Sequence, residues 1–367
     1  MTLDLILIGF GNVARRFASL LHEQRGRLAR DHNLSTRIVA VATRRHGRAY
    51  AAGGLRTATL VRAVEGGRAI GATDARPTVA FLRDAIRDSA AAARQRRLVV
   101  VETTTLDIER GEPAIAHVRA ALASGAHVVT ANKGPAAFAY RALSRAAARA
   151  NRRFLFEGAV MDGVPVFNLA RETLPAVEIV AFRGVVNSTT NYILTAMEHG
   201  QSFDEALMEM KALGIAEADA SLDVDGWDAA AKTSALANVL LGANLTPHDV
   251  EREGITAEVA QRAVDAWRAG RRLKLVARAT RDGSRITARV APEELESDDL
   301  LAGLEGQQNA LILHSDLLGR IAVVQLGGGL TQTAYALLSD LVTIARDVRS
   351  GTATRRSPTR ARRDRTP

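Results

Sequence analysis

A short apolar run that ends in a glycine-rich turn constrains the fold of this chain more than any other feature. Residues 3–8, LDLILI, are typical of a buried strand, and the next six residues, GFGNVA, fit the G-x-G-x-x-G/A pattern of dinucleotide-binding turns. Gly9 makes the tight turn, Gly11 lets backbone N–H groups approach a pyrophosphate, and Ala14 lets the next helix pack on the strand. We therefore expect nucleotide phosphates at the N-terminus of that helix. The expected cofactor-binding residues of this turn are Gly9, Phe10, Gly11, Asn12 and Val13.

Strands and helices alternate along the first part of the chain. Residues 37–43, 98–101 and 126–130 are apolar and rich in valine, and residues 114–123 have helical spacing between the second and third of these runs. This alternation predicts an α/β fold with a Rossmann-type, doubly wound parallel sheet over residues 1–150.

The remainder of the chain predicts a second, α+β domain. After a helix at residues 136–150 come β-like runs, helices between residues 192 and 241, and a hairpin with Asp282-Gly283 at its turn. A strand, three glycines and a long helix follow, so we expect the second domain to be inserted before a final helix that returns to the first. The expected boundaries are 151–311 for a catalytic and dimerisation domain, 312–350 for the returning segment and 351–367 for a disordered basic tail.

The formal net charge of +9 is unevenly distributed. Residues 351–367 hold six arginines and one aspartate, a net charge of +5, whereas the other residues together carry +4. The tail lacks aromatic side chains and apolar periodicity, so we expect a solvated terminus, with RNA or phosphate contact as the alternative.

Composition excludes several classes of protein. The chain has no cysteine, which excludes disulfides, cysteine zinc sites and a catalytic thiolate. No apolar run reaches the ~18 residues of a membrane span. The start, MTLDLILIGFG, has an acid where a signal peptide carries positive charge. We therefore expect a cytoplasmic protein with no membrane contact.

The residues after the second expected strand indicate which dinucleotide is preferred. Enzymes that prefer NAD usually place an acid there for the ribose hydroxyls, but this chain has Thr43-Arg44-Arg45. Arg44 and Arg45 would bind a ribose phosphate, which favours NADP, with NAD still possible. The alternative is that both are ordinary surface residues of an arginine-rich chain.

Lysine is rare in this chain, so each lysine is a candidate for a functional role. Among 49 basic residues only Lys133, Lys211, Lys232 and Lys274 are lysines, and lysine, unlike arginine, can give and take a proton. Lys133 follows an expected strand, in VVTANKGP, at the sheet edge where doubly wound folds bind ligands. Lys232 lies one helical turn after Asp228. We expect Lys211 and Lys274 to have no special role.

An acidic segment precedes Lys232 in IAEADASLDVDGWDAAAK. An EF-hand alignment places Lys232 at the twelfth position, where calcium binding requires a glutamate, so a calcium loop is excluded. A solvated run of charges is one alternative, but Leu222, Val224 and Trp227 alternate with the acids and would anchor the segment on a core. Anchored acids could hold a substrate ammonium group while the lysine gives a proton to a carbonyl oxygen.

Several long motifs together resemble homoserine dehydrogenase over residues 3–346. They are GFGNVA, GEPAIAHVRAALASGAHVVTANKGP, FEGAVMDGVPVF, VVNSTTNYILT, LGIAEADASLDVDGWDAAAK and GGGLTQTA. The resemblance implies a homodimer that reduces L-aspartate 4-semialdehyde to L-homoserine with NADH or NADPH, in threonine and methionine biosynthesis. The lack of cysteine argues against the acylating semialdehyde dehydrogenase, which needs a thiol nucleophile.

The resemblance also implies roles for individual residues. The implied catalytic residues are Lys232, Lys133 and Asp228, and the implied substrate-binding residues are Glu217, Asp223, Asp228 and Thr189. Further cofactor contacts would come from Thr104, Thr105, Lys133 and Gly329. A monovalent cation such as Na⁺ would bind at Glu157, Val160, Asp162 and Val164. The Met161-Asp162 pair departs from the small residues that are usual there.

Three hypotheses remain open on the sequence alone. The first is an NADP-preferring homoserine dehydrogenase, the second an oxidoreductase that acts on another small amino-acid carbonyl, and the third a cofactor-binding sensor or nucleic-acid-associated protein that uses the arginine tail. Because the chain ends soon after its last helix, we expect no regulatory ACT domain, no aspartate kinase domain and no threonine inhibition through such a domain.

Overall fold

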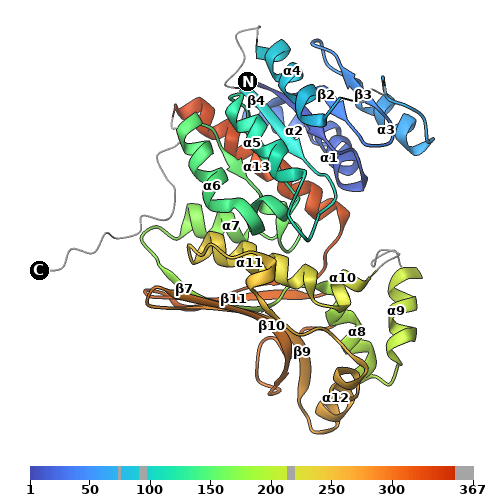
Figure 1. The fold of residues 1–367 in the computed structure, drawn as a ribbon, viewed down its shortest axis with the longest axis vertical. Helices are drawn as coiled ribbons and strands as arrows, with labels where there is room; N and C mark the ends of the chain where they lie inside the picture. The colour runs from blue at the N-terminus through green and yellow to red at the C-terminus, as the bar shows by residue number, and fades with distance from the viewer. Residues whose placement is uncertain (73–75, 91–96, 213–219, 352–367) are drawn as a thin grey trace, which may run out of the picture.

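The computed structural model describes residues 1–72, 76–90, 97–212 and 220–351. Two six-stranded sheets each form the centre of one domain, and the two domains lie one above the other in Figure 1. Glu217, Asp219 and nearly all of the expected basic tail lie outside the described residues.

The first sheet confirms the expected Rossmann-type fold. Its strand order is β3-β2-β1-β4-β5-β6, and all neighbouring strands are parallel except the edge strand β3. Nearly every residue of β1 and β4 is buried, because helices cover both faces of the sheet. The strands are β1 (Thr2–Ile8), β2 (Ser35–Ala42), β3 (Arg48–Tyr50), β4 (Leu98–Glu102), β5 (His127–Thr130) and β6 (Phe154–Leu155).

The helices of the first domain lie on opposite faces of this sheet. Leu5 and Leu7 of β1 pack in one apolar core together with Phe17 of α1, whereas Ile6 and Ile8 belong to the core on the other face. This alternation follows from the two-residue period of a strand. The helices are α1 (Asn12–Glu23), α2 (Arg25–His32), α3 (Thr57–Glu65), α4 (Thr78–Ala90), α5 (Ala114–Ala123) and α6 (Gly134–Ala150).

The second domain contains a mostly antiparallel sheet in the order β12-β11-β7-β9-β10-β8. The strands are β7 (Ile179–Val185), β8 (Glu251–Arg252), β9 (Arg272–Asp282), β10 (Arg285–Leu295), β11 (Asn309–Ser315) and β12 (Gly319–Gln325), and only β8 and β10 pair in parallel. Its helices are α7 (Val166–Asn168), α8 (Ser188–Glu198), α9 (Phe203–Ala212), α10 (Ser221–Val224), α11 (Trp227–Leu240) and α12 (Ala257–Arg268). The β9–β10 hairpin has Gly283-Ser284 as its loop, one residue later than expected.

The last helix, α13 (Leu330–Ser350), returns to the first domain as expected. Leu337, Leu341 and Ile344 share an apolar core with Phe17 of α1, and Figure 1 shows α13 lying across the first domain. The predicted boundary at residue 311 falls inside β11, and β12 pairs with β11, so the second sheet extends to Gln325. Because β12 pairs with β11 as a hairpin, residues 312–325 belong to the second domain.

Lys274, for which we expected no special role, lies in a buried polar environment. Its side chain is fully buried, and its Nζ donates to the carbonyl oxygen of Leu304 at 2.7 Å and lies 4.0 Å from Glu198. Burial lowers the pKa of Lys274 to about 8, although the charge of Glu198 works in the opposite direction. Lys274 lies among five consecutive buried residues of β9, and the sequence could not assign it this environment without knowledge of what covers the sheet.

Replacing Lys274 with methionine is expected to change how stability depends on pH. The pKa of Lys274 is about 8 in the folded protein and 10.5 as the unperturbed value. Between these values the unfolded state binds more protons, so the free energy of unfolding of the natural chain rises with pH. In Lys274→Met this contribution, approaching about 1.4 kcal/mol per pH unit, should be lost. Urea unfolding from about pH 7 to about pH 9.5 measures it, and parallel pH curves for the two proteins would contradict the assignment.

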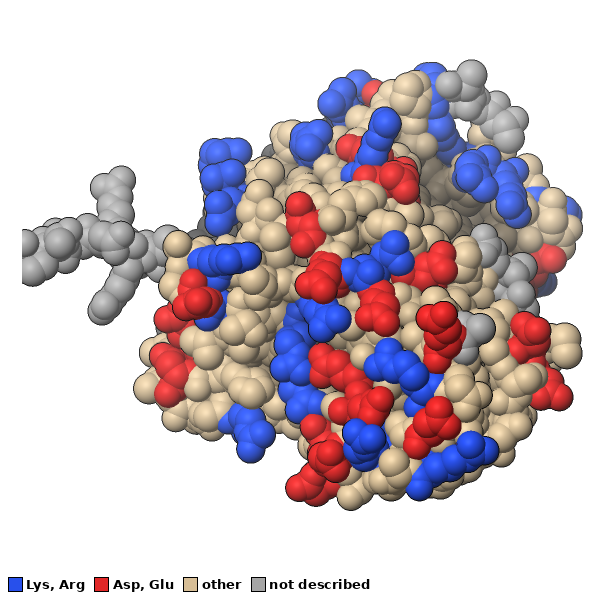
Figure 2. Space-filling model, turned by 60° about the horizontal axis from the view of Figure 1, so that its bottom comes forward, with Lys and Arg blue, Asp and Glu red and all other residues tan. Residues whose placement is uncertain are grey.

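Charged side chains of opposite sign are interleaved on the side of the molecule that carries the second sheet (Figure 2). Strands of this sheet contribute such pairs, with Arg278 at 2.6 Å from Glu293 and Arg289 at 3.2 Å from Glu251. A surface of mixed sign lacks the concentrated positive charge of a nucleic-acid site. Within the described residues, no helix is long and apolar enough to cross a membrane.

Candidate active site

The turn after β1 has the geometry that the glycine pattern predicts. Gly9 has a φ of +88°, and a Cβ there would lie 2.7 Å from the carbonyl oxygen of Thr103, so only glycine fits. Gly11 is the N-cap of α1, and a Cβ on it would meet nothing within 4 Å. The start of α1 therefore faces open space, as a phosphate site requires. The other expected cofactor residues of the turn are the buried Phe10, the exposed Asn12 and the half-buried Val13.

Hydrogen bonds join the ends of β4 and β5 beside this turn. The buried Glu102 carboxylate accepts from Thr130 Oγ1 at 3.1 Å and from the backbone N–H of Thr104 at 3.1 Å. Asn132 Nδ2 donates to the carbonyl oxygens of Thr104 and Thr105 at 2.9 and 3.3 Å. Both threonines therefore lie at the carboxyl edge of the sheet, next to the loop that follows β5.

The turn after β2 places Arg44 and Arg45 on the surface. Thr43 Oγ1 accepts from the backbone N–H of His46 at 2.7 Å and donates to the carbonyl oxygen of Gly47 at 3.1 Å, so it closes the turn. Arg44 and Arg45 are exposed, and neither forms an ion pair within the described part of the chain. Both guanidinium groups can therefore reach a ligand at this edge of the sheet.

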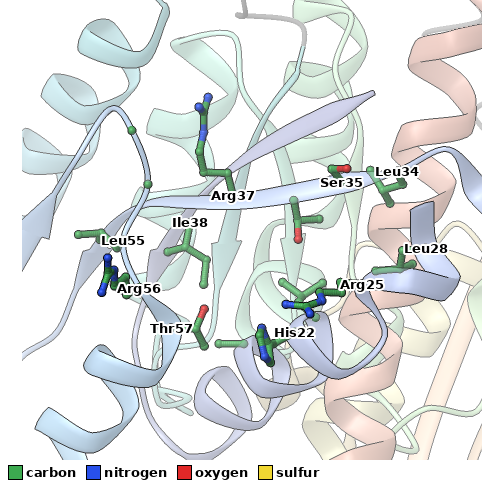
Figure 3. A pocket seen from close by; sticks show the side chains of 15 residues that line it. His22, Arg25, Leu28, Leu34, Ser35, Arg37, Ile38, Leu55, Arg56 and Thr57 are labelled. Carbon is green, nitrogen blue, oxygen red and sulfur yellow. The ribbon is translucent and has the colours of Figure 1, made fainter. Parts of the chain in front are cut away.

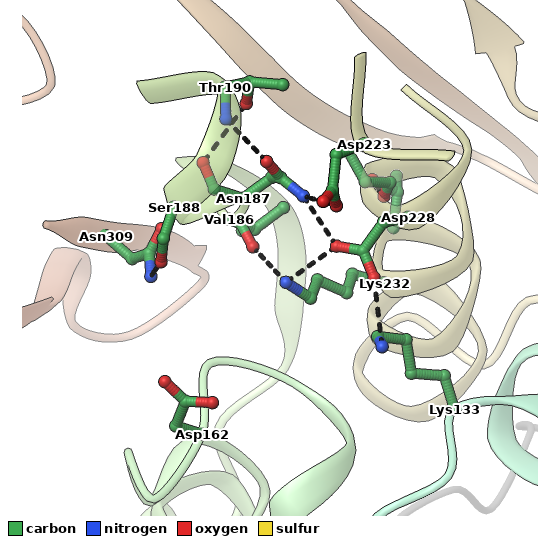
Figure 4. A network of polar contacts seen from close by, with 12 residues as sticks. Lys133, Asp162, Val186, Asn187, Ser188, Thr190, Asp223, Asp228, Lys232 and Asn309 are labelled. Atoms are coloured by element: carbon green, nitrogen blue, oxygen red, sulfur yellow. Dashed lines mark hydrogen bonds and ion pairs between the residues drawn. The ribbon is translucent and has the colours of Figure 1, made fainter. Parts of the chain in front are cut away.

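Two lysines from different domains share the carboxylate of Asp228 (Figure 4). Lys133, in the loop between β5 and α6, places its Nζ 3.0 Å from Asp228 Oδ1. Lys232, one turn further along α11, places its Nζ 2.9 Å from Asp228 Oδ2 and also donates to the carbonyl oxygen of Val186 at 2.7 Å. The three side chains keep 15 to 22% of their surface exposed, so a ligand can reach them. The cluster lies where the two domains meet.

Asn187, the N-cap of α8, connects Asp228 to a second carboxylate. Its Nδ2 donates to Asp223 Oδ1 at 2.7 Å and to Asp228 Oδ2 at 2.8 Å, while its Oδ1 accepts from the backbone N–H of Thr190 at 2.8 Å. We did not expect Asn187 to be a functional residue. An asparagine directly before a helix is a recognisable capping signal, which could have drawn attention to it.

The charges of this cluster shift pKa values in opposite directions. Burial by itself raises the pKa of Asp228, but Lys133 and Lys232 outweigh burial and hold that pKa well below its usual range. Burial, together with the charge of Asp228, raises the pKa of Asp223. Burial works to lower the pKa of Lys133, yet the Asp228 carboxylate raises it above the ordinary value. Asp228 is therefore the ionised counter-charge of both lysines, whereas Asp223 has no ion pair with a described residue.

Trp227 packs against its neighbours as expected, whereas Leu222, from which we expected the same, is 40% exposed. The guanidinium carbon of Arg252 lies 3.9 Å from the centroid of the Trp227 ring, and the ring of His248 packs against its edge at 5.2 Å. This packing fixes the start of α11, and with it Asp228. Thr189 is buried in the first turn of α8, where its hydrogen bond works to lower the pKa of Asp223.

The expected cation segment begins at Glu157, whose carboxylate is already used within the protein. It accepts from the backbone N–H groups of Phe167 and Asn168 at 2.8 and 2.7 Å. Burial, and then the charge of Asp340, raise the pKa of Glu157 to about 8. Among the described residues, no three acidic or histidine side chains are grouped to hold a metal ion. A cation here would therefore rely on backbone carbonyl oxygens, such as those of Val160 and Val164.

Asp162 connects the same segment to the glycine loop before α13. Gln325 Nε2 donates to Asp162 Oδ2 at 3.0 Å, and Thr333 Oγ1 donates to Asp162 Oδ1 at 2.9 Å. Gly329, the expected cofactor contact, is the N-cap of α13 with a φ of +155°. Figure 4 shows Asp162 apart from the lysine cluster, with no drawn contact to it, yet its charge is among those that raise the pKa of Lys133.

A separate cavity lies beside the amino end of β2, in the first domain (Figure 3). Its volume is about 470 Å³, and it is formed by α1, α2, the start of β2 and the segment before α3. The labelled lining residues include His22, Arg25 and Arg56 around the apolar Leu28 and Ile38. Because parallel sheets bind nucleotides at the carboxyl ends of their strands, this cavity is distinct from the expected cofactor site.

Comparison with known proteins identifies the family. Residues 9–157 match the model of the NAD-binding domain of homoserine dehydrogenase, and residues 165–342 match the model of homoserine dehydrogenase itself. The chain belongs to the homoserine dehydrogenase family. Its activity is that of an NAD(P)-dependent oxidoreductase, and a role in amino-acid biosynthesis follows from that activity.

Relatives cover almost the whole chain. An NAD(+)-dependent homoserine dehydrogenase from Pseudomonas canavaninivorans is 40% identical over 93% of this chain and 95% of its own length. The homoserine dehydrogenase of Methanocaldococcus jannaschii is 36% identical over 93% of this chain and 98% of its own.

Solved structures of homoserine dehydrogenases have the same fold. A crystal structure of a putative homoserine dehydrogenase from Archaeoglobus fulgidus superposes with a TM-score of 0.80 at 31% identity, over 94% of this chain and 99% of that one. A hyperthermophilic archaeal homoserine dehydrogenase in complex with NADPH has a TM-score of 0.76 at 28% identity, over 95% and 98% of the two chains.

Proposed function

We propose that this homoserine dehydrogenase reduces L-aspartate 4-semialdehyde to L-homoserine, reversibly, at the cluster of Lys133, Asp228 and Lys232. The observation that carries the proposal is the pair of ammonium groups on one carboxylate, at the domain junction and beside the carboxyl edge of the nucleotide-binding sheet. A carbonyl oxygen bound there would face two positive charges. Such preorganised charge is the main source of stabilisation for an oxygen that becomes negative during a reaction.

Lys232 is the proposed proton donor. Its Nζ uses one N–H on Asp228 and one on the carbonyl oxygen of Val186, which leaves the third for a substrate oxygen. A nicotinamide cofactor, when bound, would supply the hydride for the aldehyde carbon, which leaves negative charge on the oxygen. Lys232 stabilises that charge and gives its proton to form the alcohol. Lys133, held by the same carboxylate, is the proposed second positive charge and faces the cofactor side of the site.

Asp223 is the proposed partner of the substrate ammonium group. Both lysines pair with Asp228, whereas Asp223 makes no ion pair with a described residue and is therefore left to bind a cation. Thr189 lies beside it. Glu217, expected to bind the same ammonium group, lies outside the described residues.

Oxidation of L-homoserine by the purified protein tests the proposal. Turnover with NADP or NAD, followed by nicotinamide absorbance, is the expected result. No turnover of homoserine, together with turnover of another small amino-acid alcohol, would favour the second hypothesis of the sequence analysis. A cofactor-binding sensor would bind the nucleotide and turn over neither compound.

NADP is the proposed preferred cofactor, and Arg44 and Arg45 support this preference. Both guanidinium groups are exposed at the end of β2 and lack an ion pair with a described residue. The relatives do not decide the point, since one is named as NAD(+)-dependent and another was solved with NADPH.

Replacing Arg44 and Arg45 together, with aspartate and alanine, should shift the preference toward NAD. Loss of two charge-assisted hydrogen bonds to a phosphate should lower kcat/KM with NADP by about tenfold to a thousandfold, while an acid at this position favours the ribose hydroxyls of NAD. The ratio of kcat/KM for the two cofactors is the measurement. An unchanged ratio would mean that both arginines face only solvent.

A homodimer is the proposed assembly, with β12 in its interface. β12 is an edge strand of the second sheet, and Val324 and Leu326 in and after it are 41% and 76% exposed. An apolar edge strand left in water is a liability that a second copy would remove. Light scattering should give twice the chain mass, and Val324→Arg should lower it. Met208→Glu, at an exposed methionine of α9, is the control that should not.

A monovalent cation remains the proposed ligand of the segment from Glu157 to Val164, through carbonyl oxygens. The positive φ values of Met161 and Asp162, +52° and +51°, support it because they bend the backbone sharply there. The carboxylates of Glu157 and Asp162 already accept hydrogen bonds from other groups of the protein, so the ligands of the cation would be neutral carbonyl oxygens. A site of such low charge suits Na⁺ better than a divalent ion.

The cytoplasm is the proposed compartment.

A further inference from the structure

One asparagine amide touches both carboxylates of the proposed substrate site. Asn187 Nδ2 lies 2.7 Å from Asp223 Oδ1 and 2.8 Å from Asp228 Oδ2, so each of its two N–H groups serves one carboxylate (Figure 4). Asn187 is only 4% exposed. Two acids that would otherwise repel each other are therefore held at a fixed separation by a neutral donor.

The orientation of this amide is determined by the helix that it caps. Asn187 Oδ1 accepts from the backbone N–H of Thr190 at 2.8 Å, and the Asn187 carbonyl oxygen also accepts from Thr190 Oγ1 at 3.2 Å. A flipped amide would place its oxygen against Asp223 and Asp228 and its N–H groups against a backbone donor. The start of α8 thus keeps both N–H groups aimed at the carboxylates.

The charges around the amide are unequal. Asp228 faces two lysines, Lys133 and Lys232, whereas Asp223 faces none within hydrogen-bond distance among the described residues. Among the described residues, the Asn187 amide donates both to the carboxylate without an ion pair and to the carboxylate that holds the two lysines. The distance from a substrate ammonium group on Asp223 to the ammonium group of Lys232 depends on this connection.

We propose that Asn187 is a positioning residue that sets the spacing between Asp223, which takes the substrate ammonium group, and Asp228, which holds the catalytic lysines. The inference rests on the proposed function and deepens it. Asn187 touches neither substrate nor cofactor in this role.

The substitution Asn187→Asp separates this role from helix capping. Aspartate caps a helix as well as asparagine does, so the contact with Thr190 is kept. Both N–H donors are lost. The new carboxylate then faces two others, that of Asp223 on α10 and that of Asp228 on α11. Lys232 and Lys133 lie on the far side of Asp228. We expect the KM for homoserine to rise by about ten- to a hundredfold near pH 8. The KM for the nucleotide should stay within about twofold, since the glycine turn is unchanged.

Lowering the pH should partly restore the KM of Asn187→Asp. A protonated carboxyl group is again a donor, with one O–H in place of two N–H groups. The ratio of the variant KM to the natural KM should therefore fall from about pH 8 to about pH 6. A capping role alone predicts no such recovery.

Asn191→Asp is the matched control on the same helix. Asn191 is also buried, and its Nδ2 donates to the carbonyl oxygens of Gly306 and Gln308 at 3.0 and 3.1 Å, away from the acids. This variant should lose thermal stability without a rise in the KM for homoserine. The inference is overturned if Asn187→Asp keeps the natural KM across this pH range, or if Asn191→Asp raises the KM equally. A failure of the proposed reaction would already be seen in the natural chain, as absent turnover.

Discussion

Replacing Lys232 with methionine is expected to lower kcat for homoserine oxidation by a factor of about 10² to 10⁴. The Lys232 ammonium group is fixed by Asp228 at 2.9 Å and by the carbonyl oxygen of Val186 at 2.7 Å, with one N–H left for the substrate. Methionine has a similar length and packs similarly, but it cannot exchange a proton or stabilise negative charge. Steady-state kinetics with each nicotinamide cofactor measure the loss.

Nucleotide binding should survive this substitution, because the glycine turn and the β2 turn lie in the other domain. Titration of the variant with NADPH, followed by nicotinamide fluorescence, should give a Kd within about threefold of the natural one. Lys274→Met is the matched control, since Lys274 is a lysine outside the cluster that is buried even more deeply than Lys232, and its loss should leave kcat unchanged. If Lys232→Met keeps most of kcat, another group donates the proton, and Lys133 is the first candidate.

The fold could be predicted from the sequence because its signals are local. The strand before Gly9, the valine-rich runs and the helix at residues 114–123 carry their own periodicity, and the structure places a strand or helix at each of them. The pairing of β11 with β12 connects residues close in sequence, yet its membership of the second sheet depends on β7, more than a hundred residues earlier. Boundaries set by such distant pairing leave no local pattern, which explains the misplaced boundary at residue 311.

The site could be predicted only in part for the same reason. Lys232 and Asp228 share a helix face, so their contact follows from helical spacing. The contact of Lys133 with Asp228 joins two domains, and neither spacing nor the resemblance to a known family predicted that the two side chains pair, although both were expected at the site. Asn187 escaped notice because a capping residue is usually structural, and its second role appears only when α10 and α11 are placed around it.

Replacing Asp228 with asparagine is expected to affect both the reaction and its dependence on pH. The charge of Asp228 raises the pKa of Lys133, whereas burial alone would lower it. Without that charge two lysines face each other across a neutral amide, and the pKa of Lys133 falls. Activity in the reductive direction, which needs the protonated lysines, should therefore be lost at lower pH than in the natural chain. We expect kcat/KM to fall by about a hundredfold or more, since removal of one member of a buried ion pair costs several kcal/mol.

Asp223→Asn is the comparison that separates the two carboxylates. It changes the same atoms, but the charge of Asp223 contributes less than that of Asp228 to the raised pKa of Lys133. Its loss should therefore raise the KM for the substrate, while the alkaline limb of the pH–rate profile moves less than in Asp228→Asn. Profiles of kcat and kcat/KM for both variants, measured in the reductive direction, decide between these roles. If Asp223→Asn moved the alkaline limb as far as Asp228→Asn, the lysines would respond to the total negative charge of the site. In that case the specific bridge from Asp228 to Lys133 and Lys232 would not control the proton.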